Sequence, residues 1–199
     1  MKILVTGFEP FDGLSLNPSA QLLEHLEKEN NKTPFAFELS TLLLPVSFNH
    51  AYTSIEEKAL SFKPDIIIMT GLAQNRIDLT IEKIAVNYLN ARNPDNMGIR
   101  PQNCKIDEDG PDGIFSTLPW EEIFAWAESE RLPIKPSFTA GTYVCNDLFY
   151  KTMKFAHTNK IQSGFIHLPA TEEINPLGPF FPKHELFSLF INLLNRISK

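Results

Sequence analysis

Residues 66–72 read IIIMTGL, an apolar run of strand length that follows a break at Pro64-Asp65. An unbroken apolar run of this kind is typical of a central strand in a parallel sheet, because helices cover both faces of such a strand. We therefore expect a buried parallel strand here, with helices packed on its two sides.

The segments on either side alternate between the two kinds of element. Further strands are predicted at 3–5, 35–45, 137–139 and 164–168, and helices starting at Asn17-Pro18, Ser47, Pro119, Cys145 and Pro182. Asn and Ser are favoured N-cap residues, and Pro suits the first helical position. This alternation predicts an α/β fold, a three-layer α/β/α open sandwich with a mostly parallel, twisted sheet. The length of 199 residues fits a single domain over 1–199.

Two features of this plan concern the position of a binding site. The stretch 73–117 is rich in turn residues, and we interpret it as loops and short strands. In open α/β sheets, ligands bind beyond the carboxyl ends of the strands. We expect three loops at that edge: the one after Val5, the one after 137–139, and the one at His167.

Composition argues against several classes of protein. Hydrophobic residues make up 43% and charged residues 21%, which is ordinary for a globular protein, and the net charge of −6 does not suit a nucleic-acid binder. The longest apolar runs fall far short of the ~18–20 residues that span a bilayer, so no membrane partner is expected. The start MKILVTGF lacks a secretory apolar region of roughly 7–15 residues, so we expect a cytoplasmic location.

Cys145 is a candidate nucleophile. It stands in AGTYVCNDLFY, where a strand is predicted to turn into a helix. Free N–H groups and the dipole at a helix amino terminus can lower the pKa of a thiol, and the same N–H groups can hold an oxyanion. The alternative is a buried structural cysteine, which is the commoner state of an arbitrary Cys. Neither Cys145 nor Cys104 has a Cys or His within a few residues, so we expect no metal and no cofactor.

His167 and Glu82 are candidate partners of this thiol. His167 ends the predicted strand in SGFIHLP, and its ordinary pKa near neutrality suits a general base. Glu82 lies between apolar residues in LTIEKIAVN; a buried carboxylate needs a partner, and an imidazole is one. The alternatives are a core histidine bonded to backbone and an exposed glutamate. Residue spacing alone does not show that the three side chains converge.

Three more residues are candidates for substrate contact. Phe8 and Phe11 lie in GFEPFDG, a loop that lacks the glycine spacing of a phosphate cradle. Two aromatic rings at the end of a strand pack into the core or line an apolar pocket. Arg92 in ARNPDN is either a surface residue or a donor near the acyl carbonyl.

Six ordered motifs together resemble pyroglutamyl peptidase I, a family of cytosolic cysteine peptidases also called pyrrolidone-carboxylate peptidases. The motifs are GFEPFDG followed by Asn17-Pro18, IEKIAVN, ARNPDN, FSTLP, GTYVCN and SGFIHLP, and they run from Met1 to about Pro169. This chain departs from the family's pattern at Asp12, where Gly is frequent, and at Ala170, where an aromatic is usual. The segment 171–182 has no clear counterpart.

The resemblance implies a catalytic triad of Glu82, Cys145 and His167. It places Phe8 and Phe11 in the pyroglutamyl pocket and Arg92 near the oxyanion. It also implies an open α/β/α sandwich, a homotetramer, and peptides with an amino-terminal pyroglutamyl residue as substrates. A thioacyl-enzyme intermediate is expected on Cys145.

Two other functions remain open on the residues alone. One is a cysteine amidase with the same triad and a different pocket, acting on another cyclic or acylated substrate. The other is a nucleotide-binding or interaction module on a doubly wound sheet, since a fold by itself does not define a function. The absence of a glycine-rich phosphate loop disfavours the module.

Overall fold

The computed structural model describes residues 1–199, which form a six-stranded sheet in the order β2-β1-β3-β8-β4-β7 and a separate two-stranded sheet of β5 and β6. The elements in chain order are β1 (Lys2–Phe8), α1 (Pro18–Lys32), β2 (Glu38–Leu44), α2 (His50–Phe62), β3 (Ile66–Leu72), β4 (Leu79–Glu82), β5 (Ile84–Val86), β6 (Gly113–Phe115), α3 (Trp120–Ser129), β7 (Ile134–Ser137), α4 (Val144–Asn159), β8 (Gln162–Leu168) and α5 (Lys183–Ile197).

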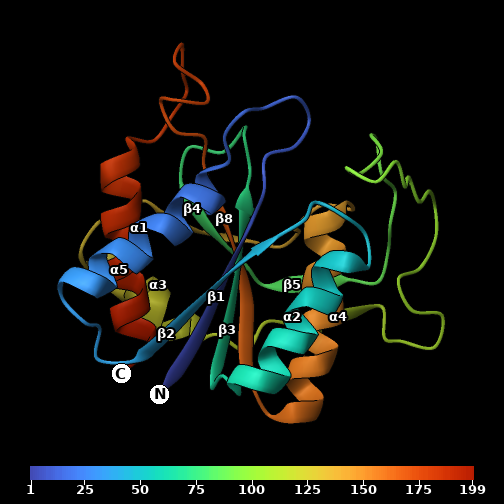
Figure 1. Cartoon of the computed structure of the whole chain (residues 1–199), viewed down its shortest axis with the longest axis horizontal. Coiled ribbons are helices and arrows are strands. Elements are labelled where there is room, and N and C mark those ends of the chain that lie inside the picture. Colours follow the sequence, from blue (N-terminus) through green and yellow to red (C-terminus); the bar gives the residue numbers. More distant parts are fainter.

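Helices cover both faces of the large sheet, as the alternation of elements predicts. In Figure 1 the sheet runs between α1, α3 and α5 on one side and α2 and α4 on the other. Two apolar clusters match these layers: Ile3, Ile66 and Ile68 face the first group of helices, whereas Leu4 and Ile67 face the second. Every residue of β3 is buried, which confirms it as a central strand.

The sheet is mixed in direction. Strands β1, β2, β3 and β8 are mutually parallel, whereas β4 runs antiparallel to β8 and parallel to β7. Thr80 pairs with both His167 of β8 and Lys135 of β7. The amino end of β7 therefore lies level with the carboxyl end of β8.

This direction corrects two predictions about β7. The strand covers Ile134–Ser137, and not 137–139; Phe138 is outside it and 67% exposed, with its ring beside Trp120. Because β7 opposes β8, the loop after it does not start at the carboxyl edge of the parallel strands. Residues 138–143 then lead from the end of β7 to the start of α4.

The sequence predicted the start of α1 correctly but not the start of α2. Asn17 caps α1 as predicted: its Oδ1 accepts a hydrogen bond of 3.0 Å from the backbone N–H of Ser19, and Pro18 is the first helical residue. The prediction that Ser47 caps the next helix was wrong. Phe48 is buried in the core and its N–H donates to Asp95, so the chain turns once more before α2 begins at His50.

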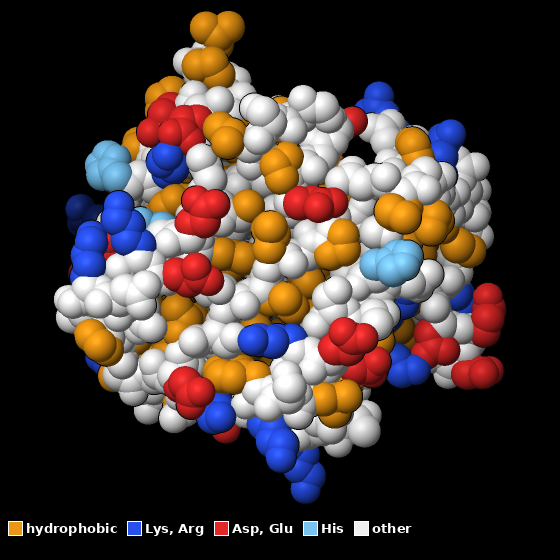
Figure 2. All heavy atoms as spheres, viewed as in Figure 1, with side chains coloured by type: hydrophobic (Ala, Val, Ile, Leu, Met, Phe, Trp, Pro, Cys, Tyr) orange, Lys and Arg blue, Asp and Glu red, His pale blue; other side chains and the backbone are white.

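Acidic and basic side chains are interspersed on the face shown in Figure 2, and no single sign dominates it. None of the five helices combines the length and the apolar character needed to cross a membrane.

Candidate active site

The pairing of β4 with β8 brings four side chains to one face of the sheet. Glu82 lies opposite Phe165 and Thr80 lies opposite His167. Directly opposed residues of antiparallel strands project to the same face, and so do residues two apart along a strand. Phe165 belongs to the apolar cluster under α2 and α4. Thr80, Glu82 and His167 therefore also point toward the α2/α4 layer.

Glu82 and His167 form a buried pair. Nδ1 of His167 lies 2.7 Å from Oε1 of Glu82, and the two residues are 5% and 0% exposed. An Nδ1–H that donates to the carboxylate leaves Nε2 as the acceptor of the neutral ring. Burial lowers the pKa of His167, and the adjacent Glu82 opposes this effect without overcoming it. His167 is therefore neutral at pH 7 and able to accept a proton.

The carboxyl group of Glu82 is charged despite its burial. Desolvation alone would raise its pKa, but the hydrogen bond and the charge of His167 and the hydrogen bond of Arg76 outweigh burial and lower it. A carboxylate that stays ionised can orient the imidazole and stabilise its protonated form.

Cys145 lies beside this pair. Cys145 is the second residue of α4. Its Sγ lies close over Gly71 of β3: a methyl group added to Gly71 would be only 3.2 Å from the sulfur. Gly71 pairs in register with His167 on the adjacent strand β8. The thiol therefore sits over the carboxyl end of β3, next to the strand position that carries His167. The structure brings the three candidates Glu82, Cys145 and His167 together.

The thiol of Cys145 differs in one respect from the expectation of a lowered pKa. Burial, followed by the negative charge of Glu82, raises its pKa to about 12, and the positive charge of Arg76 opposes this only in part. A helix amino terminus lowers the pKa of a solvated thiol. Cys145 is only partly exposed, and desolvation is the largest influence on its pKa. The thiol of Cys145 is therefore protonated at neutral pH, and it could act as a nucleophile only by losing its proton during the attack.

Phe8 and Phe11 line a small apolar cavity that reaches the thiol. The cavity is bounded by Phe8, Phe11, Asn17, Val46, Leu72, Tyr143, Val144 and Cys145. Phe8 is 2% exposed at the end of β1, and Phe11 is partly buried in the loop that follows. The two phenylalanines and the thiol thus line one and the same cavity.

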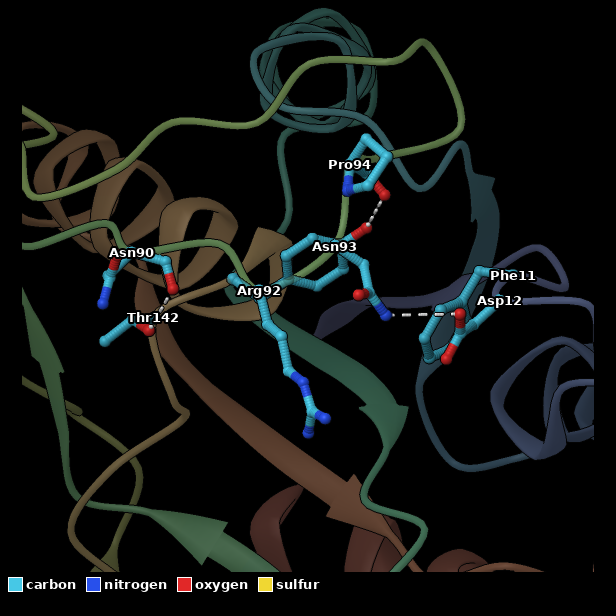
Figure 3. Close-up of a pocket in the computed structure, with 8 residues that line it drawn as sticks. Phe11, Asp12, Asn90, Arg92, Asn93, Pro94 and Thr142 are labelled. Carbon is cyan, nitrogen blue, oxygen red and sulfur yellow. Dashed lines mark hydrogen bonds between the residues drawn. The ribbon is translucent and has the colours of Figure 1, made fainter.

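Arg92 lies in an adjacent hollow, which shares Phe11 and Tyr143 with the cavity at Cys145. Figure 3 shows the Arg92 side chain extending from its loop, with no hydrogen bond to the other residues drawn. Around it, the Tyr143 hydroxyl donates to the carbonyl of Pro94 at 2.9 Å. Arg92 is exposed and is not among the residues that line the cavity at Cys145.

Sequence reasoning missed Arg76, which lies in the loop between β3 and β4. Its Nη1 donates to Oε1 of Glu82 at 2.6 Å and also contacts the hydroxyl of Thr80, and its Nη2 donates to the carbonyl of Thr139 at 3.1 Å. A signal was present, because a buried carboxylate needs charged or polar partners and Arg76 is the nearest cation before Glu82 in the sequence. The sequence predicted an imidazole partner for Glu82, and that contact is present as well: Glu82 binds both Arg76 and His167.

The arrangement has the parts of an acyl-transfer site. A thiol, a neutral imidazole and an ionised carboxylate lie together. At the start of α4 the N–H groups of Asn146 and Asp147 donate to the carbonyl of Tyr143, whereas those of Val144 and Cys145 donate to no backbone carbonyl. No three His, Cys, Asp or Glu side chains are grouped so as to hold a metal ion.

Comparison with known proteins gives one consistent family. The sequence profile of the pyroglutamyl peptidase family matches residues 1–176. Pyrrolidone-carboxylate peptidase 1 of Caldanaerobacter subterraneus subsp. tengcongensis is 43% identical over 178 residues, which cover 87% of this chain and 84% of the relative. Pyrrolidone-carboxylate peptidase of Erwinia tasmaniensis is 34% identical over 197 residues, which cover 99% and 91%.

The fold has a matching relative among solved structures. The crystal structure of pyroglutamyl peptidase I from Bacillus amyloliquefaciens aligns with a TM-score of 0.88 at 33% identity. The alignment covers 100% of this chain and 95% of that one.

Proposed function

Because the chain belongs to the pyroglutamyl peptidase family, whose members are cysteine-type exopeptidases, we propose that it cleaves the amide bond after an amino-terminal pyroglutamyl residue through a thioester on Cys145. The observation that carries this proposal is the convergence of Cys145, His167 and Glu82 beside an apolar cavity. The catalytic roles of these three residues are part of the proposal.

In the acylation step, Nε2 of His167 takes the thiol proton while Sγ of Cys145 attacks the pyroglutamyl carbonyl. The carbonyl oxygen becomes an oxyanion, which amides of the first turn of α4 stabilise. The tetrahedral intermediate collapses, the C–N bond breaks, and the imidazolium gives its proton to the leaving amine. The raised pKa of Cys145 favours a proton transfer that is coupled to the attack over attack by a preformed thiolate.

In the deacylation step, His167 removes a proton from a water molecule that attacks the thioester. The C–S bond breaks, pyroglutamate leaves, and the proton returns from His167 to the Cys145 sulfur. Glu82 remains ionised throughout and stabilises the imidazolium in both steps.

The character of the cavity supports an uncharged cyclic acyl group. The pyroglutamyl lactam carries no charge, and the cavity at Cys145 is almost wholly apolar apart from Asn17. Phe8 and Phe11 are proposed to pack against the ring. Arg92, in the adjacent hollow, is proposed to approach the acyl carbonyl or the peptide beyond it when substrate is bound.

We further propose that residues 1–199 form a single domain and that the protein is located in the cytoplasm. We also propose that it assembles as a homotetramer. The loop 171–182, at the top of Figure 1, carries Leu177 at 98% and Phe180 at 42% exposure, and large exposed apolar side chains favour burial against another surface. A thiol nucleophile is best preserved in a reducing compartment. Light scattering coupled to size-exclusion chromatography should give the tetramer mass, and a monomer would contradict the assembly.

The decisive experiment is hydrolysis of a pyroglutamyl fluorogenic amide, with prolyl and acetyl amides as comparators. Cys145→Ala and Cys145→Ser should abolish turnover while the circular dichroism spectrum and Tm stay close to those of the wild type. Cys104→Ser is the matched control, and it should stay active because Cys104 lies in another loop, outside the cavity. Near-normal turnover by a folded Cys145→Ala protein would refute the mechanism, and equal rates on all three amides would indicate a different amidase.

A further inference from the structure

The guanidinium of Arg76 binds the same oxygen that orients the proposed base. Oε1 of Glu82 lies 2.6 Å from Nη1 of Arg76 and 2.7 Å from Nδ1 of His167. The other nitrogen, Nη2, reaches the carbonyl of Thr139, which precedes the start of α4 in the loop that leads to Cys145. One side chain thus joins the carboxylate of the site to the segment that carries the nucleophile.

The contact of Arg76 with Glu82 affects the charge of His167. The charged groups that act on His167 are Glu82 from β4 and Arg76 from the loop before β4. The titratable thiol of Cys145, from α4, lies over Gly71, which pairs with His167. A buried carboxylate next to an imidazole favours the imidazolium, and a cation on the same carboxylate disfavours it. Burial is the largest influence on the pKa of His167, and Arg76 adds to it by offsetting part of the effect of Glu82.

We propose that Arg76 is a positioning residue for the reaction: it shares Glu82 with His167, restrains the loop before Cys145, and offsets the charge of Glu82 that would otherwise favour protonation of His167. This inference rests on the proposed function. It adds a fourth member to the site, one that touches neither the substrate nor the reacting sulfur.

The direction of the effect follows from the charges. Removal of the cation leaves the negative charge of Glu82 uncompensated, so the pKa of His167 should rise. The pKa of the Cys145 thiol should rise as well, because Arg76 lowers it in the intact site. The acidic limb of kcat/KM should therefore move to higher pH in a neutral variant. KM should change little, because Arg76 lines neither the cavity at Cys145 nor the hollow at Arg92.

The test compares Arg76→Gln with Arg76→Lys. In Arg76→Gln the acidic limb should move up by about one pH unit, which amounts to a roughly tenfold loss of kcat/KM below the limb and a smaller loss above it. Arg76→Lys keeps the charge but loses the second nitrogen that holds Thr139, so its limb should stay near the wild-type position while kcat falls. Arg131→Gln is the matched control, since Arg131 is an exposed cation at the end of α3.

A second measurement does not depend on turnover. The imidazole signals of His167, assigned by comparison with His167→Ala, are titrated by NMR in the wild type and in Arg76→Gln. An upward shift of the His167 midpoint in Arg76→Gln, absent in Arg131→Gln, supports the inference. Superimposed titrations overturn it, whatever happens to the rate.

Two further outcomes are distinguishable. If the wild-type protein fails to cleave pyroglutamyl amides, the proposed function is wrong, and the NMR titration still decides the role of Arg76 in the charge of His167. If Arg76→Gln does not fold, Arg76→Met provides a second neutral variant that retains the apolar stem.

Discussion

Glu82 owes its orientation and its charge to residues that are distant in sequence or in a different element. Its Oε1 accepts from His167, 85 residues away, and from Arg76 in the preceding loop, and it is fully buried. Its other oxygen, Oε2, has no hydrogen-bond partner, and the hydroxyl of Ser137, its neighbour on β7, donates instead to Thr139. Glu82 is therefore held through one oxygen by two donors.

The division of labour between His167 and Glu82 leads to a prediction. His167→Ala should lose most activity, since general base catalysis is typically worth about 10²–10⁴-fold. Glu82→Gln retains the shape of the side chain but not its charge, so it should cost less and leave measurable turnover. The acidic limb should move to lower pH in Glu82→Gln, because the imidazolium loses its stabilising anion. Steady-state kinetics across pH would contradict these roles if Glu82→Gln were less active than His167→Ala.

The close packing around Gly71 predicts that a larger side chain there displaces the sulfur of Cys145. A methyl group at this position would lie 3.0 Å from Cζ of Phe165 and 3.2 Å from Sγ of Cys145. Gly71→Ala should displace the sulfur and cost about 1–3 kcal/mol in stability from overpacking. We expect kcat to fall by more than the loss of folded protein accounts for. Ala73→Gly, just beyond β3, is the control, and normal kcat in a folded Gly71→Ala protein would show that the sulfur has room to move.

At the scale of elements, the loop after β1 and the start of α1 form one unit that shapes the cavity. Asn17 caps α1 with Oδ1, donates through Nδ2 to the carbonyl of Glu9 at 3.0 Å, and lines the cavity at Cys145. The hydroxyl of Ser19 accepts from the N–H of Phe8 at 2.9 Å. The helix start therefore fixes the path of the segment that carries Phe8 and Phe11.

Substitution of Asn17 should affect both stability and substrate binding. Asn17→Ala removes the cap and should cost about 1 kcal/mol in the free energy of unfolding. It should also raise KM, because the loop with Phe11 loses its attachment at Glu9. Asn17→Asp keeps the accepting oxygen and loses the donor, so it should retain most of the stability and still raise KM. Urea denaturation and steady-state kinetics separate the two effects, and an unchanged KM in both variants would disprove the link.

At the scale of the whole molecule, the layers bring the site together at one end of the sheet. Cys145 comes from a helix on the α2/α4 side, His167 and Glu82 from two adjacent antiparallel strands, and Phe8 from a third strand. No bound ion takes part in the proposed chemistry. The activity should require a reduced thiol and no added metal ion.

Treatment of the whole protein with chelators and thiol reagents tests that dependence. EDTA should leave hydrolysis of the pyroglutamyl amide unchanged, whereas iodoacetamide should abolish it in the wild type and in Cys104→Ser alike. Loss of activity in EDTA that zinc restores would refute the cysteine mechanism.

The sequence by itself determined the architecture and the identity of the central candidates. An unbroken apolar run predicted β3, Asn17-Pro18 predicted the start of α1, and ordered motifs singled out Glu82, Cys145 and His167. Short-range patterns suffice for the first two features because an unbroken apolar run indicates a buried strand and a cap acts on the residues next to it.

Only the tertiary structure decided the direction of β4 and β7, the contact of Arg76 with Glu82, and the raised pKa of Cys145. Strand direction depends on hydrogen bonds between segments far apart in sequence, and no local pattern in a four-residue strand encodes it. The pKa of a thiol depends on how much water and charge surround it, which is settled only when the layers pack. For the same reason a helix-terminal cysteine that would be acidic in solvent is a neutral thiol in this fold.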